Sequence, residues 1–130
     1  MTGELFIRSN QDRDLETFGS QLFDILGTKI EEVRHSDNVA GGQYLVGKVC
    51  GLRLRLENAE DAKFNTYDFL LSFEPLIRER GSDSVQLDTF ADIVAKYLAR
   101  QGLTIARPNA FGTLDQTSVE YHPEGAEFTR

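Results

Sequence analysis

Apolar and polar residues alternate through the middle of the chain, between residues 44 and 74. Leu52, Leu54 and Leu56 alternate with two arginines and a glutamate, which is the period of a strand with one buried and one solvated face. After a polar loop the same period returns and predicts that four residues share one face: Tyr67, Phe69, Leu71 and Phe73. Pro75 is expected to end that strand, because proline cannot donate to a ladder. The pattern predicts an antiparallel β-meander.

Two segments with apolar residues every three or four positions predict amphipathic helices on either side of the meander. The first follows a capping aspartate, Asp12 or Asp14, and ends at Gly27. The second follows the turn at residues 80–84 and ends at Gly102. Both helical stripes need an apolar surface to cover, and one face of the sheet provides it.

Three further strands are predicted at residues 4–8, 30–37 and 103–106, the last one stopped by Pro108. The order of elements, β-α-β-β-β-α-β, predicts an α+β fold in which two helices lie on one face of an antiparallel meander sheet. This two-layer sandwich would be a ferredoxin-like or related plait. Residues 1–130 are expected to form one domain, with a polar and mobile tail over residues 109–130.

Charge and cysteine usage narrow the function classes. The chain has 130 residues with 14 basic and 21 acidic side chains, a net charge of −7 that disfavours direct binding to nucleic-acid phosphates and favours a basic protein partner. Cys50 is the single cysteine and is expected to be a buried small hydrophobe. No apolar run reaches the roughly 18 residues of a membrane span, and the N-terminus lacks the pattern of a secretory signal. We therefore expect a cytoplasmic protein with no membrane partner.

No motif for catalysis or cofactor binding is present. His35, His122 and Cys50 do not stand in a metal-ligand spacing, and neither a phosphate-binding glycine loop nor a serine-hydrolase elbow occurs. Adjacent Glu31 and Glu32 would point to opposite faces of a strand, so they cannot act as one acid–base pair. The sequence predicts a non-catalytic protein without metal or cofactor.

Part of the chain resembles a known group of proteins. The resemblance lies in Arg34-His35-Ser36-Asp37-Asn38, Gly41-Gly42-Gln43-Tyr44, Gly47, Gly51-Leu52 and Tyr67-Asp68-Phe69. These residues are similar to those of small acidic α/β proteins encoded beside polymorphic toxins, in particular the immunity proteins of contact-dependent growth inhibition systems. The resemblance implies a cytoplasmic inhibitor that binds a toxin domain, often a nuclease with a basic cleft. It carries over no catalytic residue.

An acidic inhibitor would associate rapidly with a basic nuclease cleft, because carboxylates can imitate phosphates. The expected toxin-binding residues are exposed acids on loops and open strand faces: Glu31, Glu32, Asp37, Glu57, Glu60 and Asp61. A small enzyme or ligand-binding domain is the alternative, with a site on the open sheet face formed by His35, Tyr44, Arg53 and Arg55. An accessory or assembly subunit is a third possibility. A concave apolar pocket would favour the ligand-binding domain, and a flat acidic patch would favour the inhibitor.

Overall fold

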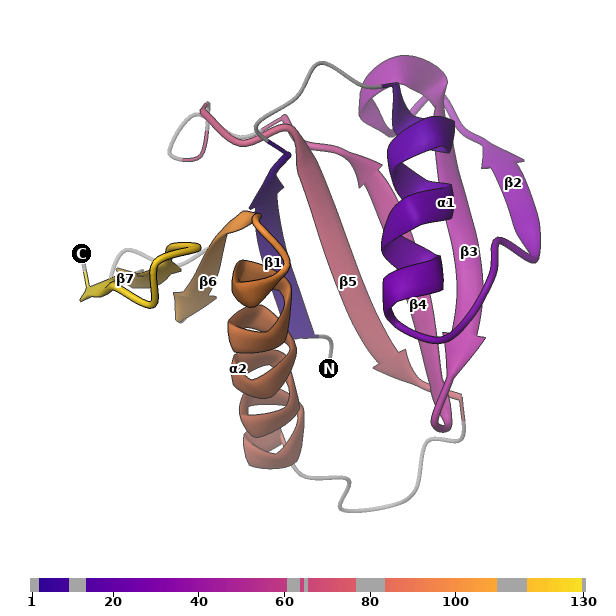
Figure 1. Cartoon of the computed structure of the whole chain (residues 1–130). Coiled ribbons are helices and arrows are strands. Elements are labelled where there is room, and N and C mark those ends of the chain that lie inside the picture. Colours follow the sequence, from indigo (N-terminus) through magenta and orange to yellow (C-terminus); the bar gives the residue numbers. More distant parts are fainter. Residues whose placement is uncertain are drawn as a thin grey trace.

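A computed structural model of the chain describes residues 3–9, 14–60, 64, 66–76, 84–109 and 117–129. These residues form eight strands and two α-helices (Figure 1). In chain order the elements are β1 (Gly3–Arg8), α1 (Leu15–Ile25), β2 (Glu32–His35), a 3-10 turn (Ala40–Gly42), β3 (Gln43–Val49), β4 (Leu52–Asn58), β5 (Phe69–Pro75), α2 (Ser84–Arg100), β6 (Thr104–Asn109), β7 (Thr117–Tyr121) and β8 (Glu127–Thr129).

All eight strands belong to one sheet in the order β2-β3-β4-β5-β1-β6-β7-β8. Every neighbouring pair is antiparallel. The predicted α+β class is therefore confirmed. The strand order is not that of a simple plait, so the finer assignment stays a prediction.

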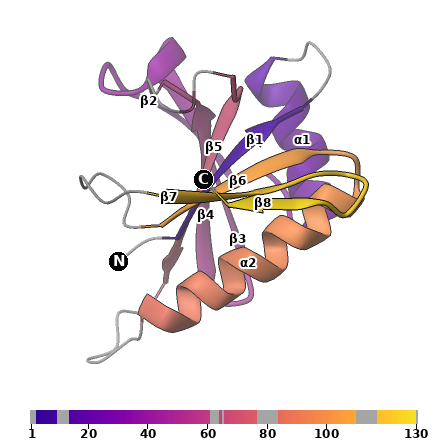
Figure 2. The same cartoon turned by 90° about the vertical axis from the view of Figure 1, so that its left-hand side faces the viewer.

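Both helices pack on the same face of the sheet, α1 over β3 and β4 and α2 over β1 and β6 (Figures 1 and 2). A single buried cluster joins them to the strands. Within it Phe18 of α1 stacks on Phe69 of β5, with ring centroids 4.3 Å apart, and Leu98 of α2 is fully buried. The apolar positions of each strand supply the other side of this core, which explains the period of two seen in the sequence.

Helix α1 has the predicted end signals. The Asp14 carboxylate accepts a hydrogen bond from the Thr17 N–H at 2.7 Å, and this contact holds the pKa of Asp14 below its ordinary value. Gly27 follows the helix with a φ of +81°, a conformation that glycine adopts without strain. Of the two predicted caps, Asp14 is the one that acts, and Asp12 lies outside the described residues.

Pro75 ends its strand as expected, whereas Pro108 lies inside the strand that it was expected to stop. Pro75 is the last residue of β5 and is paired with Leu52, and Pro108 of β6 is paired with Ser118. On the β1 side, the described pairing ends two residues earlier, at Phe73 and at Ala106. Within the described residues each proline is thus paired with one strand, on the side away from β1, and a missing N–H is tolerated at such a position.

The C-terminal segment also differs from the expected mobile tail. Its described part, residues 117–129, forms β7 and β8, and β7 pairs with β6 through Val119 and its neighbours. Tyr121 of β7 is buried in the main core. The polar composition of this segment reflects an edge of the sheet, where one face and one side meet solvent.

Candidate functional site

The face of the sheet that carries no helix is lined by charged side chains from four neighbouring strands. Because Leu54 and Leu56 of β4 point into the core, Arg53, Arg55 and Glu57 must point away from it. The registers of β2, β3 and β5 place further side chains on the same face of the sheet, beside those of β4. We define the open face as the side chains that point away from the helices between β2 and β5: Glu32, Arg34, Tyr44, Val46, Lys48, Arg53, Arg55, Glu57, Leu70, Ser72 and Glu74.

Most of the charged side chains of the open face are joined in ion pairs. Arg53 lies directly opposite Glu74, and the two side chains meet at 2.8 Å. Arg55 Nε lies 3.4 Å from a Glu57 oxygen, 2.5 Å separates Arg34 Nε from Glu32, and Lys48 lies 3.9 Å from Glu31. Acids and cations are therefore interleaved, so this face is a mixed-charge surface and not a purely acidic one.

The guanidinium of Arg55 lies over the ring of Tyr44, with 4.1 Å between its central carbon and the ring centroid. This is a cation–π contact between neighbouring strands, and it fixes both side chains flat against the sheet. Val46 lies opposite Arg55 and is only 3% exposed although no helix covers it. We attribute this burial to the long side chains around it, whose apolar stems lie along the sheet.

Glu32 and Arg34 form an ion pair at the edge of the sheet, and each stabilises the charged form of the other. The hydrogen bond to Arg34 and its positive charge hold the pKa of Glu32 below its ordinary value. In return Glu32, and then Tyr44, raise the pKa of Arg34. Both side chains are about half exposed, so this contact orders them more than it stabilises the fold.

The β4–β5 loop covers the neighbouring part of the same face, over β1 and β6. Phe64 stacks on Phe6 with ring centroids 4.1 Å apart, and Tyr67 meets both rings edge-on. Arg8 holds the loop by hydrogen bonds to the carbonyl and hydroxyl of Thr66. The sequence pattern placed Tyr67 with Phe69 on the helix-covered face. That prediction is wrong, because Tyr67 precedes β5 and packs on the other side of the sheet.

The predicted toxin-binding acids do not form one patch. Glu31, Glu32 and Glu57 are each paired with a cation of the open face. Asp37 and Glu60 are exposed and lie in the β2–β3 and β4–β5 connections, which leave the sheet at the same end because β2 and β4 run parallel to each other. Asp61 lies outside the described residues.

Glu31 also differs from the orientation expected for it. Its N–H donates to the Val46 carbonyl at 2.8 Å, while the ladder pairs Val46 with Glu32. Glu31 and Glu32 thus both lie opposite Val46 of β3, and two successive residues opposite one are the arrangement of a β-bulge. As a result Glu31 and Glu32 both reach cations of the open face, Lys48 and Arg34.

The alternative ligand site is assembled only in part. Tyr44, Arg53 and Arg55 lie together on the open face, whereas the alternation along β2 places His35 on the opposite side from Arg34. Sequence reasoning missed Arg34, Lys48 and Glu74. The signal for Glu74 was its alternation with Phe73, but only the register brings it to Arg53.

Cys50 is exposed in the β3–β4 turn and has a φ of +51°, so the prediction of a buried core cysteine is wrong. It lies at the opposite end of β3 from the residue paired with His35, and the two cannot form a nucleophile–base pair. Among the described residues no group of three histidine, cysteine or acidic side chains could hold a metal ion. In the same part of the chain, no helix has the length and apolar character needed to cross a bilayer.

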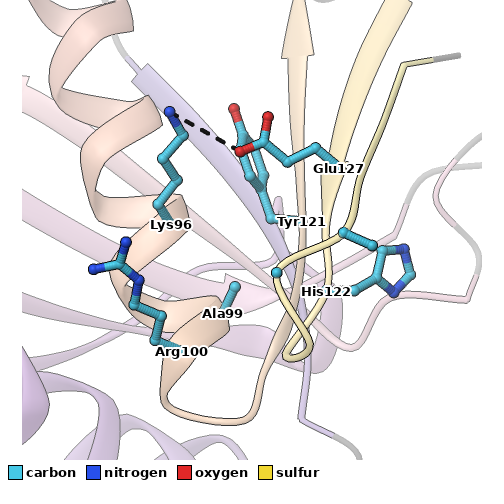
Figure 3. A pocket seen from close by; sticks show the side chains of 8 residues that line it. Lys96, Ala99, Arg100, Tyr121, His122 and Glu127 are labelled. Carbon is cyan, nitrogen blue, oxygen red and sulfur yellow. Dashed lines mark ion pairs between the residues drawn. The ribbon is translucent and has the colours of Figure 1, made fainter.

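A small pocket of about 90 Å³ lies between the end of α2 and the β7–β8 hairpin (Figure 3). Lys96 and Glu127 face each other across it at 4.0 Å, while His122 and Arg100 point to either side. Ligand pockets usually enclose roughly 300–1,000 Å³. This hollow is too small and too divergent in its polar groups to serve as a substrate site.

A polar network borders the pocket and ties α2 to the end of the sheet. The Tyr121 hydroxyl donates to Asp92, and Arg107 and Lys96 lie 3.9 and 3.2 Å from the Asp92 oxygens. Burial acts to raise the pKa of Asp92, but the hydrogen bonds from Tyr121 and Lys96 outweigh it and hold this pKa below its ordinary value. Burial and the contact with Asp92 raise the pKa of Tyr121. We regard this network as structural, since each polar group in it already binds another group of the same network.

No protein-family model, no curated protein and no solved structure matches this chain. A functional proposal therefore rests on the geometry of the chain itself.

Proposed function

We propose that this chain is a non-catalytic inhibitor of the immunity type, which binds and neutralises a toxin domain, in the simplest case a basic nuclease, in the cytoplasm. The observation that carries the proposal is the open face, which is not the acidic patch expected from the sequence but a broad sheet surface of ordered side chains with mixed charge and one tyrosine, Tyr44. Such a surface suits another protein better than a small molecule, because ligand sites are concave and enclosed. The pocket between α2 and the β7–β8 hairpin is small and lies elsewhere.

Arg55 and Tyr44 are the anchors we assign to this interface. Arginine and tyrosine are among the residue types that dominate binding energy at protein interfaces. Their stacked arrangement at 4.1 Å, together with the Arg53–Glu74 ion pair, holds the surface in one conformation before binding. Preorganisation of this kind lowers the entropy lost on association.

Negative charge is supplied at one end of the open face. Asp37 and Glu60 are exposed in the two connections that leave the sheet beside Glu57. With a net charge of −7, the chain attracts a basic partner over a distance, and the loop acids would orient it. Of the six predicted acids, these two loop residues are thus the ones best placed for direct contact.

Co-expression with the C-terminal domain of a large protein encoded immediately upstream tests the proposal. We expect growth to be protected by the wild-type chain and by Asp24→Lys, a control on the exposed side of α1. Protection and the measured affinity should fall in Tyr44→Ala and Arg55→Glu, and the salt dependence of binding should weaken in Asp37→Lys/Glu60→Lys. Equal protection by all these variants would reject the open face as the interface. A lack of protection by the wild type would reject the inhibitor itself.

The second candidate is a ligand-binding domain that uses Tyr44, Arg53 and Arg55. One observation favours it: Arg55 Nε is buried and has no hydrogen-bond acceptor in the described part of the chain, although Glu57 lies 3.4 Å away. A thermal-shift screen with small carboxylates and phosphates separates the two functions. Stabilisation that is lost in Arg55→Ala, combined with no toxin binding, would favour the ligand-binding domain.

We also propose that strands β4, β5, β1 and β6 are the core of a ferredoxin-like plait, extended by two strands at each side. Their spatial order and their antiparallel pairing suit that arrangement. This assignment bears on architecture alone, because one fold hosts many functions.

A further inference from the structure

We propose that two copies of this chain associate through the free edge of β2, so that two sheets join into one continuous sheet across a twofold axis. This inference concerns self-association and is independent of the proposed toxin binding. It rests on three features of β2: its place at the end of the strand order, the direction of its backbone groups and the sequence of its charges.

β2 is an uncovered edge strand. It is the first strand in the sheet order, with β3 as its neighbour, and all four of its residues are exposed. Val33 is one of the large hydrophobic side chains that solvent reaches, with 41% exposure. An edge of this kind presents unpaired N–H and C=O groups that can accept another strand.

The ladder determines which backbone groups are free. The Ser36 N–H donates to the Gly42 carbonyl at 3.0 Å, and the register pairs Arg34 with Tyr44 and Glu32 with Val46. In an antiparallel pair, alternate residues bond the neighbour and the residues between them point away. The N–H and C=O groups of Val33 and His35 therefore point outward, spaced to bond a second strand.

The charges of β2 are complementary to β2 itself. Around Val33 the sequence reads Glu32-Val33-Arg34. In a second, antiparallel copy centred on Val33, each Glu32 lies opposite the Arg34 of the other copy, and the two valines face each other. A twofold pairing centred on Arg34 would instead place two arginines opposite each other. The charges thus select one register.

Edge strands usually carry charge to prevent such pairing. A run of like charges would do so here, because it would repel an identical strand. β2 has one acid and one base on the same face, two residues apart and already in contact at 2.5 Å. In the dimer this pair becomes a cluster of four alternating charges, which is attractive. A strand of four residues buries little area, so we expect a weak dimer that forms at high protein concentration.

Sedimentation velocity and light scattering on the full chain, over a concentration series, test the proposal. We expect a monomer–dimer equilibrium in the wild type. Glu32→Arg and Arg34→Glu should each weaken dimerisation by about tenfold or more, because like charges then oppose each other twice. The combined swap Glu32→Arg/Arg34→Glu should restore it.

A mixture of the two single variants is the sharper test. One presents two basic side chains on this face of β2 and the other presents two acidic ones, so the mixture should form a heterodimer although neither variant dimerises alone. Val33→Pro provides a backbone control, since it removes an outward N–H and none of the bonds to β3. It should stay folded by circular dichroism and lose the dimer.

Two outcomes overturn the proposal. The first is a wild-type chain that remains monomeric up to about 1 mM, the weak end of measurable affinity. The second is a dimer that all of these variants retain, which would place the contact on another surface.

Discussion

Gly47 of β3 is a position where a backbone atom stands in the way of an added methyl group. A Cβ built on Gly47 would lie 2.8 Å from the Lys29 carbonyl oxygen and 3.0 Å from a ring carbon of Phe23. The first obstacle is backbone, and the second belongs to a side chain that is fully buried, so neither can move away without disturbing its surroundings. Gly47 allows the chain that leaves α1 to lie directly on β3 before it reaches β2.

The cost of Gly47→Ala can be worked out from these contacts. Overpacking of a closed site costs about 1–3 kcal/mol. Replacing a strand glycine returns roughly 0.5–1 kcal/mol through the reduced entropy of the unfolded chain. The net loss of unfolding free energy is then about 0–2.5 kcal/mol, or a Tm lower by up to roughly 10 °C for a chain of this size.

Differential scanning calorimetry of Gly47→Ala measures this loss, and Gly3→Ala is the matched control. At Gly3 the nearest atom to an added Cβ belongs to the Phe73 side chain, at 3.3 Å, and the nearest backbone atom lies at 3.5 Å, so we expect a smaller loss than in Gly47→Ala. A Tm for Gly47→Ala equal to or above that of Gly3→Ala would refute the reasoning, because it would mean that the segment after α1 does not lie against β3.

Three further predictions test other parts of the fold. Asp92→Asn should lower stability at pH 7 by about 1 kcal/mol or less, because the side chain is partly exposed. The folded-state pKa of Asp92 is lowered, so its stabilisation exists above the unfolded pKa of about 3.9 and is lost as the pH falls. The unfolding free energies of variant and wild type, measured in urea, should therefore converge below about pH 4. Cys50 should react with a thiol reagent in the native protein nearly as fast as in the denatured one, and slow labelling would contradict its exposed position. Phe64→Ala should lower the unfolding free energy by roughly 2–4 kcal/mol through loss of the stack on Phe6, whereas a change below about 0.5 kcal/mol would show that the β4–β5 loop does not cover the sheet there.

The elements with strong periodicity were predictable from the sequence. The stripe of α1 and the alternation of Leu52, Leu54 and Leu56 arise from local packing rules, and the structure places them as expected. Pro108 was misjudged because a local rule about proline was applied without knowledge of the neighbouring strands. Pro75 and Pro108 are tolerated where the described pairing with β1 has already ended, and that boundary depends on the strand order.

The candidate site was predictable only strand by strand. The run from Arg53 to Glu57 shows in the sequence that two arginines share one face of β4. That Tyr44 lies beside Arg55, and Glu74 beside Arg53, follows from registers set by residues far away in the chain. The sequence analysis wrongly placed His35 with Tyr44, Arg53 and Arg55, because the face to which His35 points is set by the pairing of β2 with β3.

The two faces of the sheet differ in what they contribute to stability and to binding. The helix-covered face holds the core, where each large residue such as Leu54 or Phe73 contributes several kcal/mol on burial. The partly exposed Arg53–Glu74 ion pair of the open face contributes about 0–1 kcal/mol, because solvent screens it. Replacing Arg55 or Glu32 would therefore change what the surface binds far more than whether the chain folds. This separation lets the charge pattern of the open face change without loss of the fold, which is what the proposed binding role would require.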